Sequence, residues 1–112
     1  MIRRGAVYFG DLGDNGDGVQ SGVRPLLVVQ NDTGNKHSPT TIVVPITSKR
    51  KNKMPTHFNI KLDKKSTVLC EQITVIHKSK LFDRIYILSE EELNDLDKAL
   101  MISLGIEGGK NG

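Results

Sequence analysis

One stretch decides how this chain folds, residues 21–32, which read Ser21-Gly22-Val23-Arg24-Pro25-Leu26-Leu27-Val28-Val29-Gln30-Asn31-Asp32. The continuously apolar run from Leu26 to Val29 is typical of a buried strand. A glycine-rich loop ends at Gly22, and Pro25 fixes its own φ and pushes Arg24 toward an extended conformation. The sequence therefore predicts a stiff strand that begins with a cation at the mouth of a loop.

Arg24 is the first candidate for chemistry. A charged group on a rigid strand beside a loop is where binding and catalytic groups tend to lie. The alternative is a surface arginine that caps the strand, which is the commoner role of an exposed arginine. The residues of this stretch leave both interpretations open.

Length and composition restrict the class of protein. The chain has 112 residues, 26% of them charged and 37% hydrophobic, which fits one soluble globular domain. The net charge of +3 permits a polyanionic partner without requiring one, and positive charge gathers at residues 49–53 and 64–65. No apolar run approaches the roughly 20 residues that span a bilayer, and no signal segment is evident. The single cysteine allows no intrachain disulfide, so we expect a cytoplasmic protein without a membrane contact.

Short strands are predicted for most of the chain. β-forming residues and period-two alternation place them at Ala6–Leu12, Arg24–Gln30, Thr41–Thr47, Thr56–Leu62, Ser66–Ile76 and Phe82–Leu88. Pro45 lies inside the third of these, which favours an edge or bulged strand. Turn-forming residues separate the strands, notably at residues 13–22, 31–35 and 78–80. Consecutive strands joined by short turns imply antiparallel pairing.

Only the C-terminal part predicts a helix. Ser89-Glu90-Glu91-Glu92 is a capping box, and an apolar stripe follows at helical spacing: Leu93, Leu96, Leu100 and Leu104. The helix is expected to end near Gly105, so that residues 1–105 form a single domain and residues 106–112 a flexible tail. We therefore predict a mainly β (α+β) fold, a small, strongly bent antiparallel β-barrel with a C-terminal helix.

Several chemistries lack a supporting motif. The three histidines are widely separated, and Asp11, Asp14 and Asp17 do not follow calcium-loop spacing, so no metal or other cofactor is expected. Cys70 follows two apolar residues, which is typical of a buried, inert cysteine. Neither a G-x-S-x-G elbow nor a glycine-rich phosphate-binding motif is present.

The basic loop after the third predicted strand gives nucleic-acid binding more support. Its cations are Lys49, Arg50, Lys51 and Lys53. Such a loop can follow a phosphate backbone, although it can equally be a solvated hairpin tip. Polar residues at strand ends are candidates to line a groove, or make routine strand-end hydrogen bonds: Thr47, Ser48, Glu71 and Gln72. With two Tyr, three Phe and no Trp, RNA recognition would depend on hydrogen bonds and phosphates rather than on stacking.

Five segments in order carry a family resemblance. They are RGAVYF (residues 4–9), GVRPLLVVQND (22–32), SPTTIVVPIT (38–47), PTH (55–57) and EQI (71–73). Together they resemble the MazF/PemK toxins of bacterial toxin–antitoxin systems. The resemblance extends from about Arg3 to Gly105.

This resemblance implies an SH3-like barrel, a homodimer, and a sequence-specific endoribonuclease that cuts single-stranded RNA without a metal. It also implies neutralisation by a cognate antitoxin whose disordered acidic tail covers the RNA groove. The family's catalytic residues correspond to Arg24 in G-V-R-P and Thr47 at the end of I-T. Glu71 and Gln72 would bind RNA, and the loop that holds Gln20 would help to set base preference.

Two other functions stay open. A toxin of the same barrel type can bind and poison a protein such as a DNA topoisomerase without cutting RNA, and its function would then map to the C-terminal helix. A plain RNA-binding module would bind without strand scission. The pairs Arg24-Pro25 and Ile46-Thr47 favour the nuclease.

Overall fold

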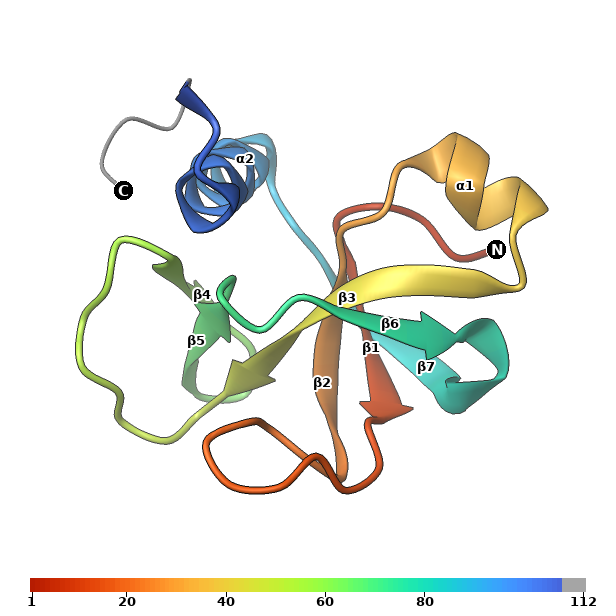
Figure 1. Ribbon diagram of the computed structural model, residues 1–112, viewed down its shortest axis with the longest axis horizontal. Coiled ribbons are helices and arrows are strands. Elements are labelled where there is room, and N and C mark those ends of the chain that lie inside the picture. The colour runs from red at the N-terminus through yellow and green to blue at the C-terminus, as the bar shows by residue number, and fades with distance from the viewer. Residues whose placement is uncertain (108–112) are drawn as a thin grey trace.

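The computed structural model describes residues 1–107, in which seven antiparallel strands form one sheet that curls into a half-barrel (Figure 1). The strands are β1 (Ala6–Asp11), β2 (Val23–Val28), β3 (Thr40–Thr47), β4 (His57–Lys61), β5 (Lys65–Leu69), β6 (Thr74–His77) and β7 (Leu81–Ile87). The helical elements are α1 (Asp32–His37), the short 3-10 helix η1 (Lys78–Lys80) and α2 (Glu90–Leu104). The predicted mainly β architecture with a C-terminal helix is confirmed.

Strand β2 lies between β1 and β3 and has no solvent face along its apolar run. Successive side chains of a strand point to opposite sides of the sheet. Leu26 and Val28 pack into one apolar cluster, whereas Leu27 and Val29 pack into another that includes Leu96 of α2. Burial on both faces explains why four consecutive residues here are apolar.

Strand β3 changes neighbours at Pro45. Of the two predicted alternatives, an edge strand or a bulged strand, the edge position is wrong because β3 is paired on both sides. On the side away from β2, β6 pairs with β3 up to Val43, and β5 pairs with its C-terminal end. Val29 N–H donates to the Ile42 carbonyl at 2.9 Å, and the alternation of antiparallel bonds then turns the Pro45 nitrogen away from β2. The missing N–H thus lies where the partner strand is interrupted.

This interruption splits the single strand predicted over residues 66–76 into β5 and β6. A turn between them is closed by Gln72 N–H, which donates to the Leu69 carbonyl at 3.1 Å. The prediction of one strand fails because the apolar pattern continues through the bend. The bend arises because β5 and β6 pair with different parts of β3.

The turn predicted at residues 31–35 is also wrong, because helix α1 begins there. The Asn31 side chain accepts a hydrogen bond from Gly34 N–H at 2.8 Å and caps the helix. Asn35 is fully buried and accepts a hydrogen bond from the Thr41 hydroxyl at 2.6 Å. This short helix depends on tertiary hydrogen bonds, which sequence periodicity does not reveal.

Helix α2 has the predicted capping box. The Ser89 hydroxyl accepts from Glu92 N–H at 3.1 Å, and the Glu92 carboxylate accepts from Ser89 N–H at 2.9 Å. Gly105 ends the helix with φ at 70°, a conformation that favours glycine. The predicted tail falls partly at residues 108–112, which lie outside the described residues.

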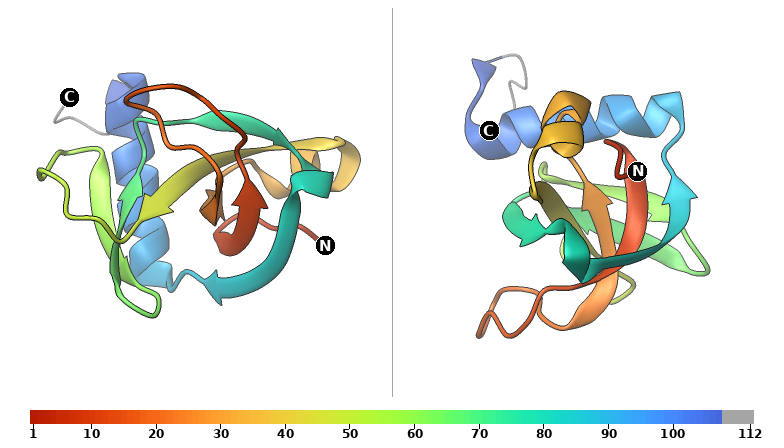
Figure 2. Two further views of the ribbon diagram at one scale, coloured as in Figure 1. Left: turned by 90° about the horizontal axis from the view of Figure 1, so that it is seen from below. Right: turned by 90° about the vertical axis from the view of Figure 1, so that its right-hand side faces the viewer.

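The apolar stripe of α2 packs on the sheet for most of its length. Leu96 is completely buried, and Leu93 and Leu100 are partly buried against the same cluster. Leu104 is 61% exposed, so the prediction that the stripe packs on the sheet is wrong for this last residue. The loop between β1 and β2 lies on the side of the molecule opposite α2 (Figures 1 and 2). No helix within residues 1–107 is long and apolar enough to cross a membrane.

Leu96→Ala is expected to lower the free energy of unfolding by about 2–5 kcal/mol, because it leaves a cavity between α2 and the sheet. The matched control is Leu104→Ala, which is expected to change stability by less than about 0.5 kcal/mol because that side chain is exposed. Urea denaturation followed by far-UV circular dichroism measures both. Equal losses in the two variants would contradict the packing described for α2.

Candidate active site

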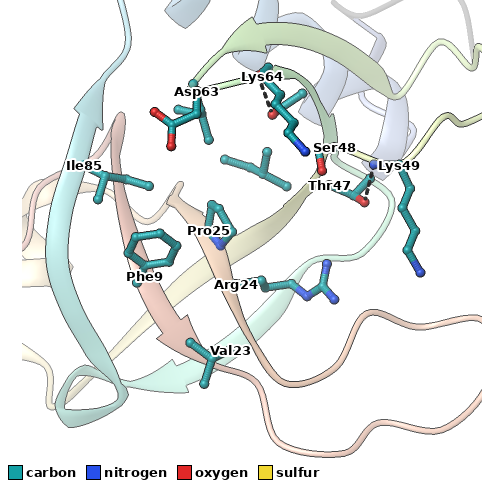
Figure 3. Close-up of a pocket in the computed structure, with 13 residues that line it drawn as sticks. Phe9, Val23, Arg24, Pro25, Thr47, Ser48, Lys49, Asp63, Lys64 and Ile85 are labelled. Atoms are coloured by element: carbon teal, nitrogen blue, oxygen red, sulfur yellow. Dashed lines mark hydrogen bonds between the residues drawn. The ribbon is translucent and has the colours of Figure 1, made fainter.

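A pocket of about 560 Å³ opens where β1, β2 and the end of β3 meet the turn between β4 and β5 (Figure 3). Its apolar walls include Phe9, Val23, Pro25, Ile46, Leu62 and Ile85. Its polar side chains are Arg24, Thr47, Ser48, Lys49, Asp63, Lys64 and Ser66. The volume falls within the range of about 300–1,000 Å³ typical of ligand sites, so the pocket can hold more than one phosphate group.

Arg24 is the second residue of β2 and stands opposite Gly10 of β1. Its Nε donates to the Ser21 carbonyl at 3.0 Å. Its two terminal nitrogens have no hydrogen-bond or ion-pair partner within residues 1–107. Figure 3 shows the guanidinium pointing away from Phe9, toward the side of the pocket where Thr47 and Lys49 lie. A bond through Nε fixes the guanidinium while both Nη groups stay available for a bidentate contact with a phosphate.

Thr47 ends β3 and is only 5% exposed. Lys49 N–H donates to its Oγ1 at 3.2 Å, which orients the oxygen and leaves the hydroxyl proton available to donate. Figure 3 shows the Thr47 hydroxyl and the Arg24 guanidinium at the same end of the pocket. A hydroxyl donor beside a guanidinium forms a site for an anion with several oxygens.

A second cavity, of about 380 Å³, meets the first at Arg24. It is lined by Arg24, Lys51 and loop residues 16–21. Gln20 N–H donates to Gln72 Oε1 at 2.8 Å and joins this loop to the turn between β5 and β6. Because a backbone N–H requires an acceptor, this bond orients the Gln72 amide and leaves its NH2 group free to donate.

Glu71 lies in the turn between β5 and β6 and lines neither cavity. Its carboxylate accepts from the Thr56 hydroxyl at 3.0 Å and contacts His57 Nε2 at 3.0 Å. Burial raises the pKa of the Glu71 carboxyl, but hydrogen bonds from His57, from the Glu71 backbone and from Thr56 outweigh burial and lower the pKa below its ordinary value. The Nδ1 atom of His57 is buried without a partner among residues 1–107, which favours the tautomer with the proton on Nε2.

The structure brings together part of the predicted site. Arg24, Thr47, Ser48 and Lys49 line the first cavity, and Gln20 and Lys51 line the second together with Arg24. Gln72 is connected through its hydrogen bond with Gln20. Arg50, Lys53 and Glu71 are exposed and line neither cavity.

Lys64 is a member of the site that the sequence does not predict. It lines the first cavity from the turn between β4 and β5. The basic loop precedes β4 in the chain, whereas Lys64 follows it. The pair Lys64-Lys65 is visible in the sequence as positive charge. Which of the two lysines faces a cavity depends on the register of the β4–β5 hairpin, in which Lys65 pairs with Lys61.

The structure also bears on two other kinds of site, a metal site and a reactive thiol. Within residues 1–107, no group of three or more His, Cys, Asp or Glu side chains could hold a metal ion. Asp11 and Asp14 instead accept hydrogen bonds from loop N–H groups at 2.9 and 3.1 Å. Cys70 is fully buried, as predicted, and burial, with a smaller contribution from Glu71, raises the pKa of its thiol to about 12.

The fold and its pocket define a small protein of the β-barrel type with a cationic pocket at the start of a buried strand. A family model described as PemK-like, MazF-like toxin of type II toxin–antitoxin system matches residues 3–104. The chain belongs to this family of toxins, as the motifs indicated.

Solved structures share this fold. An endoribonuclease in complex with its cognate antitoxin from a mycobacterial species is 27% identical, with a TM-score of 0.82 over 95% of this chain and 97% of that one. A further mycobacterial endoribonuclease is 25% identical, with a TM-score of 0.79 over 94% and 92%. MazF from Deinococcus radiodurans is 20% identical, with a TM-score of 0.80 over 93% and 96%, a likeness that concerns the fold alone.

The Cys70 thiol is expected to resist alkylation by iodoacetamide at pH 8 in the folded protein, because it is buried and its pKa is raised to about 12. Denaturation in guanidinium chloride should allow complete modification. Mass spectrometry of the intact protein measures the added mass in both states. Rapid alkylation of the folded protein would contradict the inert role of this cysteine.

Proposed function

We propose that this toxin is an endoribonuclease that cuts single-stranded RNA at a short sequence, with mRNA among its targets, and thereby arrests growth. The observation that carries the proposal is the pairing of Arg24, whose Nη groups are free of partners within residues 1–107, with the Thr47 hydroxyl in one pocket. The mycobacterial endoribonucleases of similar fold support RNA as the substrate.

RNA supplies its own nucleophile. The ribose 2′-oxygen attacks the adjacent phosphorus and loses its proton, the bond from phosphorus to the 5′-oxygen breaks, and the 5′-oxygen takes up a proton. The products are a 2′,3′-cyclic phosphate and a 5′-hydroxyl. The protein's task is to align the strand, stabilise the charge that develops on the phosphorane, and assist the proton transfers.

Arg24 and Thr47 divide this task. Guanidinium groups remain protonated in proteins, so Arg24 acts as a charge stabiliser that pairs two phosphate oxygens, and not as a general base. The Thr47 hydroxyl donates to the same phosphate. Because the positive charge comes from a fixed side chain, the reaction requires no metal ion.

The surroundings of the pocket suit an extended single strand. The basic loop with Lys49, Arg50, Lys51 and Lys53 offers exposed cations to the phosphate backbone. Ser48 adds a hydroxyl at the pocket. Gln20 and Gln72, joined by a hydrogen bond, present their remaining polar groups at the other side of Arg24, where bases can be distinguished. Glu71 precedes Gln72 in the same turn and is the more distant candidate for an RNA contact.

We also propose that the chain acts in the cytoplasm as a homodimer and is neutralised by a cognate antitoxin with a disordered acidic tail. The exposed cations of the pocket suit an acidic partner, and the similar mycobacterial endoribonuclease forms a complex with its cognate antitoxin. Exposed apolar residues of the edge strand β7 that do not line the pocket support the dimer: Phe82 and Ile87.

Purified protein, free of antitoxin, is expected to cut a long single-stranded RNA in the presence of EDTA, at discrete sites that share a short motif. Primer extension locates the cuts. The matched control is Arg24→Ala, which should lose at least about 10³-fold in rate with an unchanged circular dichroism spectrum. Intact RNA with a folded wild-type protein would overturn the proposal and favour a toxin of the same barrel type that poisons a protein target.

Thr47→Val is expected to slow cleavage by about 10²–10³-fold, because it removes one donor to the developing charge while keeping the shape of the side chain. Thr47→Ser retains the hydroxyl and should remain within about tenfold of the wild-type rate. Single-turnover cleavage of a short RNA that contains the mapped site measures both. A fully active valine variant would remove Thr47 from the mechanism.

A further inference from the structure

Lys64 stands on the wall of the 560 Å³ pocket that faces Ser48 and Thr47. Figure 3 shows its ammonium group directed toward Ser48, whereas the carboxylate of the preceding residue, Asp63, points toward the opposite side, near Ile85. Within residues 1–107, the Lys64 ammonium makes no hydrogen bond or ion pair. The pocket thus holds a third cation, besides Arg24 and Lys49, and none of the three forms an ion pair within residues 1–107.

The backbone of Lys64 is fixed by its own turn. Its carbonyl accepts a hydrogen bond from Leu62 N–H at 3.2 Å and another from the Ser66 hydroxyl at 2.9 Å. Ser66 is only 4% exposed, and the strands on either side are joined by the pair Lys61 and Lys65. A lysine on such an anchored turn can present its ammonium to one place without first ordering the loop that carries it.

We propose that Lys64 binds an RNA phosphate next to the one that is cut, an inference that rests on the proposed endoribonuclease function. Arg24 and Thr47 hold the scissile phosphate at one end of the pocket. Every internal phosphate of a strand has neighbours, and the remaining volume with Ser48, Lys49 and Lys64 accommodates one of them. Lys64 is therefore a substrate-binding residue, and its partner group is a phosphodiester rather than a base.

The test compares Lys64→Gln with Lys65→Gln, which removes the same charge from an exposed neighbour that does not line the pocket. The probe is a mixed-sequence single-stranded oligodeoxynucleotide of about 10 nucleotides, within the length that one small barrel covers, which offers the same phosphodiesters but has no 2′-hydroxyl and cannot be cut by this reaction. Fluorescence anisotropy at several salt concentrations gives the dissociation constant and its salt dependence. Cleavage of an ordinary long RNA is measured in parallel.

Lys64→Gln is expected to weaken binding several-fold and to reduce the slope of log K against log salt by about 0.7, the value for one phosphate contact on a single strand. KM should rise, with little change in kcat. Lys65→Gln should leave the slope and KM close to wild type.

Equal changes in both variants, or none in Lys64→Gln, would overturn this inference and leave the nuclease proposal standing if the wild-type protein still cuts RNA. A change specific to Lys64 in a protein that cuts no RNA would instead support the phosphate site and overturn the nuclease. Failure of the wild-type protein to bind the probe would overturn the Lys64 site.

Discussion

Burial of β2 on both faces is the constraint on which the rest of this structure depends. Leu26 and Val28 fill one apolar cluster, and Leu27 and Val29 fill the other, so the strand cannot slide or turn over without exposing half of its apolar side chains. Arg24 lies two residues before this run in the same strand, so the buried strand also fixes the position of its backbone. Its side chain needs only one local bond, to Ser21, to be held at the mouth of the pocket.

The change of partner strand at Pro45 also positions residues of the site. β3 passes from one partner strand to another there, and the freed turn between β5 and β6 carries Gln72 to the loop that precedes β2. Beyond Pro45, Thr47 is held by pairing with Thr67 of β5. The change of partner at this proline thus contributes both to the position of Gln72 beside the β1–β2 loop and to the position of Thr47.

The ion pairs of residues 1–107 lie away from the pocket. Arg4 contacts Asp97 at 2.7 Å, and His57 contacts Glu71 at 3.0 Å. In the pocket, Arg24, Lys49 and Lys64 have no acidic partner among residues 1–107. Arg24, which is held through Nε and unpaired at both Nη groups, requires little reorganisation to receive a phosphate, and this is the electrostatic basis of the proposed RNA cleavage.

The sequence by itself determined the local features: the buried strand after Gly22, the extended Arg24 before Pro25, the inert Cys70 and the capped helix after Ser89. Each depends on residues close together in the chain, so propensity and motif were sufficient. The tertiary structure alone decided that β3 is central, that residues 66–76 bend, that residues 32–37 form a helix, and that Lys64 rather than Lys65 faces the pocket. These depend on strand register and on partners distant in sequence, and a pattern read along one chain carries no information about such pairings.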